Sequence, residues 1–429
     1  TKINNIDMSA KFGQFAAGLL VKYLFSCVID ADRYDTYTFI EGKVQQQNIN
    51  KPTLWNELAN RLETKLNNFQ KSNKIDLLRE EVSMSCKSFA ENKPGIYQLS
   101  VPTGGGKTLS SLRYGLNHAK KFNKDRIFYI IPFTTIIDQN AKEIKEILGH
   151  EDLILEHHSN LIVDNDQEDY KLLTERWDSP IILTTMVQFL DTLFSGGTQN
   201  IRRMHNLANS VIIFDEIQAI PIKCINMFNS TINFLSYVCN ATIILCTATQ
   251  PLLSTTKMPL KLSDHPNIIP DIHTKFKQFK RVNLVDSCIT GGYSADLLKD
   301  FILDVMNKVE SVLVILNTRN SAKEIFNLLK EENKNLPKEK QYLIFHLSTN
   351  MCPAHRMKIL EDMRKILGHQ RIICISTQLI EAGVNISFGC VIRSLAGLDS
   401  IAQAAGRCNR HGETNCSDVY IVNIENENI

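Results

Sequence analysis

The sequence predicts an α/β protein with two parallel-sheet lobes in tandem, preceded by a helical segment. From Gly95 onward, short β-rich runs alternate with helical segments, which is typical of βαβ units. The alternation lapses over residues 257–281, a stretch with Pro and Lys that indicates a linker, and a second alternating set follows. A chain of 429 residues is also too long for one ordinary core, which favours two or three domains.

The segment before the first lobe is expected to be helical. Residues 9–29 form an apolar-rich stretch interrupted by polar side chains, which predicts a buried helix rather than a membrane span. The polar run 30–36 predicts a turn at the end of that helix. Residues 43–93 are rich in Asn, Gln and Lys and contain no strand-like run, so we expect them to form a connector and helices.

The β-rich runs are the predicted strands of the two lobes. Those of the first lobe are Ile96–Val101, Ile127–Ile131, Leu153–Glu156, Ile181–Leu183, Val211–Phe214 and Thr242–Cys246. Those of the second lobe are Val282–Val285, Ser311–Leu316, Tyr342–Phe345, Arg371–Ile375, Gly389–Ile392 and Asp418–Val422. Because helical segments separate successive runs, each lobe is expected to hold a parallel sheet covered by helices.

Composition limits the possible function classes. The hydrophobic content of 43% and the charged content of 22% are typical of a soluble globular protein. The net charge is only +2, so a nucleic-acid partner would have to bind in a local groove rather than to a basic surface. The 11 cysteines include no CxxC pair, which gives a zinc site no support and favours the reducing cytoplasm.

A glycine-rich loop follows the first predicted strand. Its sequence is Pro102-Thr103-Gly104-Gly105-Gly106-Lys107-Thr108. The glycines let backbone N–H groups approach phosphate oxygens, and the next helix start adds partial positive charge. We expect Lys107 to reach the β- and γ-phosphates of ATP and the Thr108 hydroxyl to bind Mg²⁺. Val101 stands where the general phosphate-loop pattern has glycine, and a simple glycine-rich turn is the alternative.

Two carboxylates follow the predicted strand Val211–Phe214. Ligands bind at the carboxyl ends of parallel strands, which is where Asp215 and Glu216 are expected to lie. Asp215 is the candidate Mg²⁺ ligand, and Glu216 is the candidate general base that polarises the attacking water. An Asp-Glu pair at a strand end is weak support alone, but after a phosphate loop it indicates nucleotide hydrolysis.

Two arginines near the end of the second lobe complete the candidate catalytic set. They lie in Gln403-Ala404-Ala405-Gly406-Arg407-Cys408-Asn409-Arg410. Their spacing of three would place them on one face of a helix. Arginine binds phosphate oxygens bidentately and keeps its charge, so with Gln403 they are expected to make hydrolysis depend on lobe closure. Two surface arginines are the alternative.

These motifs together resemble those of superfamily 2 helicases. The set is the phosphate loop, Asp215-Glu216-Ile217-Gln218, Thr247-Ala248-Thr249, Ser376-Thr377-Gln378 and the arginine string. Longer strings resemble the CRISPR-associated helicase-nuclease of type I interference systems, namely residues 156–160, 209–219, 246–251 and 398–403. The resemblance covers nearly the whole chain. It implies two RecA-like lobes that use ATP and Mg²⁺ to move along single-stranded DNA.

The resemblance also implies a DNA track at strand ends. In the first lobe the track residues are Pro132, Phe133, Thr134, Thr135, His157, His158, Ser159, Thr184, Thr185 and Gln188. In the second lobe they are Asn317, Thr318, Arg319, Ser376 and Thr377. Such groups contact the backbone rather than the bases, so binding is expected to be independent of sequence. Gly383 and Asn385 are expected at the nucleotide, although the family usually has Asp at position 385.

The family also carries an N-terminal HD nuclease, which works with Mn²⁺, Ni²⁺, Co²⁺ or Fe²⁺. Residues 19–36 resemble its last helix and turn, and Asp32 matches its final metal-binding Asp. A lone Asp cannot build a metal site, so the chain as given is not expected to be a nuclease. The expected divisions are an HD remnant at 1–45, a helical connector at 46–94, and RecA-like lobes at 95–275 and 276–429.

The sequence therefore predicts an ATP-dependent translocase or helicase on single-stranded DNA, and the resemblance implies that it moves 3′→5′. The resemblance implies recruitment by a CRISPR RNA-guided surveillance complex. A monomer when free, a cytoplasmic location and no membrane partner are expected. Two alternatives stay open: an RNA helicase of the same superfamily, and a non-motor nucleic-acid-binding module with a vestigial ATP site.

Overall fold

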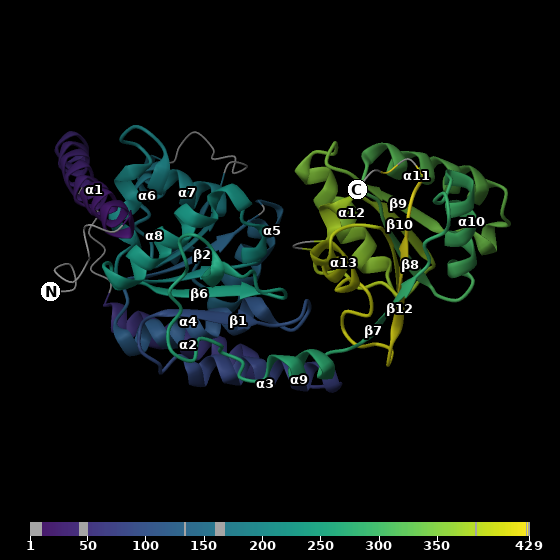
Figure 1. Cartoon of the computed structure of the whole chain (residues 1–429), viewed down its shortest axis with the longest axis horizontal. Helices are drawn as coiled ribbons and strands as arrows, with labels where there is room; N and C mark the ends of the chain where they lie inside the picture. Colours follow the sequence, from purple (N-terminus) through teal and green to yellow (C-terminus); the bar gives the residue numbers. More distant parts are fainter. Residues whose placement is uncertain are drawn as a thin grey trace. The chain divides into compact units, whose positions relative to one another are not determined.

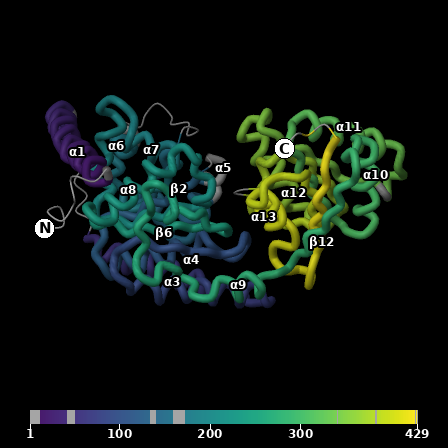
Figure 2. The backbone as a smooth tube through the Cα atoms, in the orientation of Figure 1, coloured from purple at the N-terminus to yellow at the C-terminus, as the bar shows by residue number. Residues whose placement is uncertain are grey.

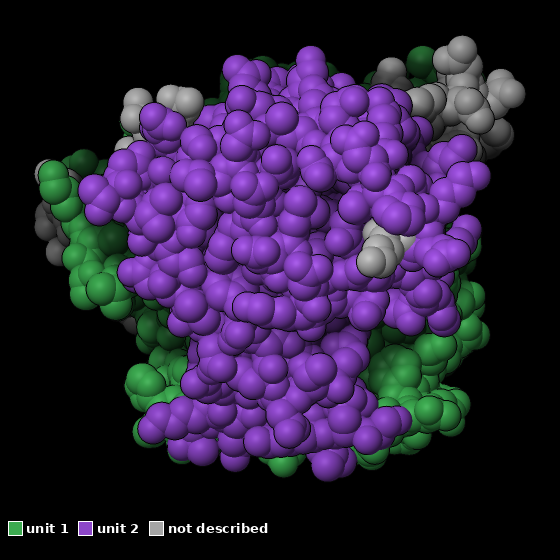
Figure 3. Space-filling view, turned by 90° about the vertical axis from the view of Figure 1, so that its right-hand side faces the viewer, with its two compact units in different colours: residues 1–71, 79–101, 106–273 green, residues 72–78, 102–105, 274–429 purple. Residues whose placement is uncertain are grey.

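Two parallel sheets organise the protein, whose computed structural model describes residues 11–42, 50–132, 134–158, 168–381, 384–425 and 427. The chain divides into two compact units (Figure 3). The first unit comprises residues 1–71, 79–101 and 106–273, and the second comprises 72–78, 102–105 and 274–429. Each unit holds one six-stranded sheet, so the predicted α/β fold with two parallel-sheet lobes is confirmed.

The first sheet has the strand order β1-β6-β5-β2-β4-β3, and all its paired strands are parallel. Its strands are β1 (Ile96–Ser100), β2 (Arg126–Ile131), β3 (Ile154–His157), β4 (Ile181–Thr185), β5 (Ser210–Phe214) and β6 (Thr242–Thr247). The strands consist almost wholly of buried residues, as expected when helices cover both faces of a parallel sheet.

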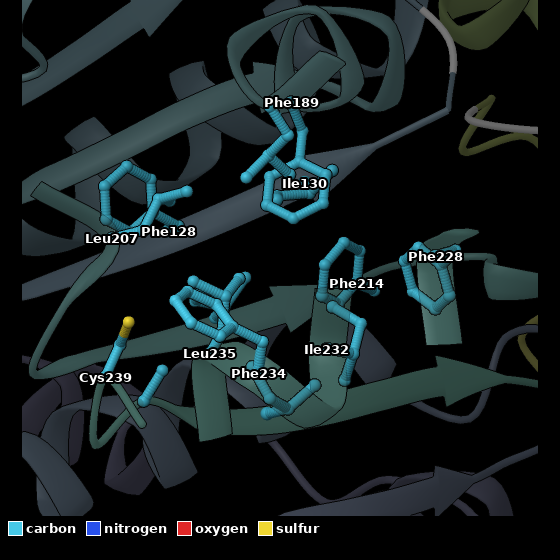
Figure 4. Packing of buried hydrophobic residues seen from close by; sticks show 14 of the residues in the cluster. Phe128, Ile130, Phe189, Leu207, Phe214, Phe228, Ile232, Phe234, Leu235 and Cys239 are labelled. Atoms are coloured by element: carbon cyan, nitrogen blue, oxygen red, sulfur yellow. The ribbon is translucent and has the colours of Figure 1, made fainter. Parts of the chain in front are cut away.

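Helices cover the first sheet on both faces. They are α4 (Lys107–Phe122), α5 (Thr134–Leu148), α6 (Glu168–Arg176), α7 (Met186–Phe194) and α8 (Ile225–Tyr237), with α2 (Lys51–Asn67) and α3 (Lys74–Phe89) preceding β1. Figures 1 and 2 show α6 and α7 above β2 and β6, and α4 below them. On the α7–α8 face, Phe214 of β5 packs edge-on against Phe189 and Phe228, each with ring centroids 5.1 Å apart (Figure 4).

The second sheet has the order β7-β12-β11-β8-β10-β9, again with parallel pairs throughout. Its strands are β7 (Val282–Asp286), β8 (Ser311–Ile315), β9 (Leu343–Leu347), β10 (Ile372–Ser376), β11 (Cys390–Ser394) and β12 (Ser417–Val422). The helices α10 (Ala295–Met306) and α11 (Arg319–Lys334) contribute to the core on one face. On the other face, α12 (Pro353–Ile366) and α13 (Leu398–Ala405) do so.

The N-terminal helix corrects two expectations. Helix α1 (Lys11–Glu41) continues through 30–36, where a turn was predicted. The run contains no Gly or Pro to end the helix, and the buried Asp30 holds this part of α1 against unit 1 through Arg176 and Arg202. The prediction of a buried helix is also wrong, because only 22% of its most apolar window is buried. By length and composition alone, Phe12–Ile40 is the one described helix that could cross a membrane.

The predicted linker at 257–281 is also only partly correct. Its first half runs beside β1, where Gln98 N donates to Pro266 O at 2.8 Å and Ile268 N donates to Gln98 O at 2.9 Å. The side chains of Leu260, Ile268 and Ile269 are buried. An edge strand needs partners for its outward amides and carbonyls, and this segment supplies them. Helix α9 (Ile272–Gln278) follows, so the passage to the second unit is shorter than predicted.

Candidate nucleotide and nucleic-acid sites

The strand order of the first sheet brings the candidate nucleotide residues to one half of its carboxyl edge. Strand β6 lies between β1 and β5. The phosphate loop follows β1, Asp215 follows β5, and Thr247 ends β6. The carboxyl ends of parallel strands lie at the same edge, so three segments far apart in sequence meet there.

The phosphate loop has the conformation that its glycines allow. Gly104 and Gly106 have φ angles of +80° and +83°, in the left-handed region that favours glycine. Gly105 N donates to Pro102 O at 2.9 Å, which closes the turn. Helix α4 then begins at Lys107 without a side-chain cap. An uncapped helix start with glycines before it presents N–H groups suited to phosphate oxygens.

A buried ion pair connects the loop to the carboxylates. Lys107 Nζ lies 2.5 Å from Glu216 Oε1, and the Lys107 side chain is 9% exposed. Burial alone would lower the pKa of Lys107, but Glu216 and Asp215 outweigh it and raise that pKa. Burial and the neighbouring Glu216 raise the pKa of Asp215 to about 6, although Lys107 opposes them. The site therefore holds two carboxylates and one cation, of which Lys107 and Asp215 are buried and Glu216 is partly exposed.

Gln218 joins Glu216 to the end of β6. Its amide Nε2 donates to Glu216 Oε2 at 2.7 Å, and its Oε1 accepts from the Thr247 hydroxyl. The same hydroxyl accepts from Thr249 N at 3.0 Å. Both oxygens of Glu216 are thus held, one by Lys107 and the other by Gln218. Hydrogen bonds thus connect the phosphate loop, the segment 215–218 and the end of β6 in one series.

The residues that would hold Mg²⁺ fit that ion. Asp215 offers a buried carboxylate, with one oxygen accepting from Glu216 N at 3.0 Å, and Thr108 offers a hydroxyl in the first turn of α4. Such oxygen ligands suit Mg²⁺. Asp32 is exposed on α1. Within the described part of the chain, no group of three or more His, Cys, Asp or Glu could hold a metal ion.

The predicted DNA residues of the first unit lie at the other half of the same edge, after β2, β4 and β3. His157 ends β3 and lies in register with Thr184 of β4, whose hydroxyl donates to His157 O at 2.9 Å. Thr185 caps α7 by accepting from Gln188 N at 3.1 Å. The buried His158 follows β3. Thr184 and Thr185 are thus occupied by local hydrogen bonds, which makes backbone groups the better candidates for contacts to a nucleic-acid strand.

Two residues that the sequence did not single out organise this half. Arg203 Nη2 donates to Gln188 Oε1 at 2.8 Å, and its guanidinium lies 4.6 Å from the Trp177 ring centroid. Trp177 Nε1 in turn donates to His157 Nδ1 at 3.0 Å. Burial, then Arg203 and His158, lower the pKa of His157 to about 3, so it stays neutral. The only sequence signal was the adjacent pair Arg202-Arg203.

Some predicted residues lie outside the described part of the chain. These are Phe133, Ser159 and Gly383, together with the side chains of Thr134 and Thr135 at the start of α5. Pro132 follows β2 and is half-buried.

The arginine string of the second unit departs from the expected helix. Helix α13 ends at Ala405, so Gln403 is helical while Arg407 and Arg410 follow it. Arg407 is 3% exposed and donates to the carbonyls of Ile380 at 2.8 Å and Glu381 at 2.6 Å. Arg410 is half-buried and its Nε donates to Asn385 Oδ1 at 2.9 Å. Arg407 therefore binds buried backbone carbonyls, whereas Arg410 binds the side chain of an exposed residue.

The predicted DNA residues of the second unit follow β8 and β10. The Asn317 side chain bonds Ser394 Oγ, Leu395 O and the buried Arg393, at 3.2, 2.9 and 2.7 Å. Thr318 caps α11 by accepting from Ser321 N at 3.1 Å.

The remaining members of the predicted set differ in exposure. Arg319 Nη1 donates to Asn350 Oδ1 at 2.5 Å on the surface. Ser376 and Thr377 are buried.

Comparisons with known proteins show what the chain is similar to. A family model of DEAD/DEAH box helicases matches residues 81–258, and one of the C-terminal part of the CRISPR-associated nuclease/helicase Cas3 matches residues 308–413. The CRISPR-associated nuclease/helicase Cas3 of Haloferax volcanii is 26% identical over 422 residues, which cover 75% of this chain and 45% of that protein. The chain thus spans about half the length of that relative.

Solved structures share the fold. The structure of T. fusca Cas3 with AMPPNP has a TM-score of 0.64 and 16% identity, over 86% of this chain and 48% of that chain. S. cerevisiae Dbp5 bound to RNA and ADP BeF3 has a TM-score of 0.58 and 15% identity, over 86% of this chain and 87% of that one. Identities this low show the fold alone. The family matches and the relatives make the chain similar to the CRISPR-associated nuclease/helicase Cas3, and the DEAD/DEAH box match covers the part that holds the first sheet.

Proposed function

We propose that the chain is an ATP-driven translocase on single-stranded DNA that moves 3′→5′ in CRISPR interference. The observation that carries the proposal is the buried Lys107–Glu216 pair at the carboxyl edge of the first sheet. A cation and a base joined to each other, beside a phosphate loop, are the parts that phosphoryl transfer to water requires.

Lys107 is the residue that would change partners when ATP binds. Its ammonium group is paired with Glu216. The triphosphate carries more negative charge than one carboxylate, so the proposal moves Lys107 to the β- and γ-phosphates. Glu216 then keeps its bond to Gln218 and gains a free oxygen to accept a proton from water. Mg²⁺, held by Asp215 and Thr108, would neutralise phosphate charge.

Gln218 and Thr247 would carry the state of the nucleotide site to β6. Gln218 is bonded to both Glu216 and Thr247. A shift of the Glu216 side chain would therefore either move Gln218 with it or break the bond between them. In the second unit, Arg410 is the candidate arginine for the phosphates, because its partner Asn385 is exposed and uncharged. This assignment, like the 3′→5′ direction, is part of the proposal.

The choice of DNA over RNA rests on the family match. Two relatives that match about three quarters of the chain are named as a CRISPR-associated nuclease/helicase and a putative one, while another is an ATP-dependent helicase Lhr-Core. A helicase bound to RNA shares the fold at a TM-score of 0.58, so the fold alone does not separate the two substrates. Thr184, Thr185 and Asn317 are occupied by internal bonds, which favours contacts to a phosphate backbone over reading of bases.

The test compares ATP hydrolysis with single-stranded DNA and single-stranded RNA of equal length and sequence. We expect DNA to stimulate turnover several-fold and RNA to do so weakly. Stimulation by RNA alone would support the RNA helicase alternative, and no stimulation by either strand would favour a binding module with a vestigial site. Lys107→Ala separates the activity from a contaminating ATPase, because it removes the phosphate-binding cation.

The remaining parts of the proposal follow from the family. They are recruitment by a CRISPR RNA-guided surveillance complex, a free monomer, a cytoplasmic location, and coupling in the whole protein to an HD nuclease with its own transition metal. For this chain, exposed Asp32 gives no support to strand cleavage.

A further inference from the structure

The segment between β8 and α11 holds a set of anion-binding groups in the second unit. Helix α11 is 16 residues long, and Asn317 and Thr318 lie directly before it. Backbone N–H groups at such a position point along the helix axis, where the helix dipole favours negative charge. This is the place where the sequence predicts a DNA phosphate.

A carboxylate from the far end of the chain occupies these groups. Glu427 accepts from Asn317 N at 3.0 and 3.1 Å, one distance for each carboxylate oxygen, and from Thr318 N at 3.0 Å. The Ser394 hydroxyl donates to it as well. Glu427 is 8% exposed, and its first partner lies 110 residues away in sequence. The groups therefore hold a dehydrated anion with two backbone amides and a hydroxyl.

Helix capping does not account for this contact. The first turn of α11 already has its cap, because the Thr318 side chain accepts from Ser321 N at 3.1 Å. The amides that Glu427 occupies belong to the two residues before the helix. Burying a carboxylate costs free energy that needs compensation, and here the compensation is a donor set that would equally suit a phosphate.

The walls of the site are fixed independently of Glu427. Asn317 is held through its side chain by Arg393 at 2.7 Å and by Leu395 O at 2.9 Å. Arg393 is fully buried and also lies 2.7 Å from Glu381. These contacts keep the Asn317 amide in place when its anion changes.

We propose that Glu427 is an intramolecular competitor for a phosphodiester group of the bound strand at the Asn317–Thr318 amides. The inference rests on the proposed function, because it takes single-stranded DNA as the ligand. A strand that enters must displace the carboxylate, so Glu427 weakens binding of the first phosphate and leaves a DNA-free chain with its anion site filled.

The test is Glu427→Gln in the whole chain, with Glu425→Gln as the matched control. Glu425 lies two residues away and is exposed, so its variant changes the net charge equally without touching the site. The glutamine side chain keeps the size of Glu427 but loses its charge and offers one acceptor oxygen in place of two. We expect Glu427→Gln to lower the Kd for single-stranded DNA about three- to tenfold, and Glu425→Gln to leave it within about twofold.

Thermal unfolding separates competition from a structural role. If Glu427 served only to brace the loop, Glu427→Gln would lower the melting temperature and leave DNA affinity unchanged or weaker, which would overturn the inference. Should that variant not fold, Glu427→Asp keeps the charge but shortens the reach by one methylene, and tighter DNA binding is again expected. Absence of DNA binding by the unaltered chain would instead refute the proposed function, and the inference with it.

Discussion

The two units share a six-stranded parallel sheet but treat their buried charged side chains differently. In the first unit, Lys107 and Glu216 form an ion pair, which the proposed mechanism exchanges for a contact between Lys107 and a phosphate. In the second unit, Arg407 is bonded to two backbone carbonyls that are part of its own fold. In the proposed mechanism, Lys107 and Glu216 take part in the chemistry, whereas Arg407 holds backbone groups of the second unit in place.

The largest expected effect is on the exchangeable pair of the first unit. Glu216→Gln keeps the shape of the side chain and an acceptor for Lys107, but it removes the base. We expect ATP turnover to fall about a hundredfold or more, since general-base catalysis contributes about 10²–10⁴-fold. Nucleotide affinity is expected to change only slightly. Steady-state hydrolysis and titration with a fluorescent ATP analogue measure the two quantities.

The control for Glu216→Gln is Glu146→Gln. Glu146 is exposed on α5 of the same unit, so its variant removes one charge without touching the site. It is expected to hydrolyse ATP at the unaltered rate. A Glu216→Gln variant that kept more than about a tenth of the turnover would contradict the role of Glu216 as base, because general-base catalysis supplies more than that.

The second prediction uses the two arginines to separate positioning from chemistry. Arg407→Ala leaves the buried carbonyls of Ile380 and Glu381 without their donors, which typically costs about 1–3 kcal/mol for each buried group. Arg410→Ala removes a bond to exposed Asn385, so its cost is expected to stay below about 1 kcal/mol. Arg410→Ala is expected to lower turnover instead.

The tryptophans make this difference measurable unit by unit. Both tryptophans of the chain, Trp55 and Trp177, lie in the first unit. Urea unfolding followed by tryptophan fluorescence therefore reports the first unit, while circular dichroism reports both. Arg407→Ala is expected to shift the circular dichroism transition to lower urea and to leave the fluorescence transition in place. Equal shifts for both arginine variants would contradict the different roles given to Arg407 and Arg410.

The local sequence pattern was sufficient to predict the strands and to place the phosphate loop and Asp215 after two of them. Each predicted β-rich run became a strand, because a buried parallel strand needs an apolar run and a turn signal after it. Pro102–Thr108 and Asp215 could be placed at one edge because parallel strands all end there. That much of the site depends only on residues close together in sequence.

The parts that failed depend on partners far away in the chain. The expected turn at 30–36 stayed helical because buried Asp30 meets Arg176 and Arg202, more than a hundred residues later. The structural role of Arg407, which binds two backbone carbonyls after β10, could not be predicted. Every residue has a carbonyl oxygen, so the sequence does not show which ones an arginine will bind. The contact between the Glu427 carboxylate and the backbone amides before α11 could not be predicted either, because backbone amides are likewise common to almost all residues.

The smallest expected effect concerns Asn385, where the resembled family usually has Asp. Asn385 offers Arg410 an uncharged acceptor at 2.9 Å. Asn385→Asp would turn that bond into an ion pair and hold the guanidinium in one orientation, which lowers the cost of ordering it. The residue is exposed, so the gain is expected to be below about 1 kcal/mol, or about two- to fourfold in kcat.

The series at position 385 tests whether Arg410 differs from Arg407 in being adjustable. Turnover is expected to rise in the order Asn385→Ala, unaltered chain, Asn385→Asp, with the urea transition of the second unit nearly unchanged throughout. If turnover instead followed the stability of the variants, Arg410 would have a structural role like that of Arg407. A fall in kcat for Asn385→Asp would show that Arg410 must leave this partner to act, because a stronger bond then becomes a barrier to its motion.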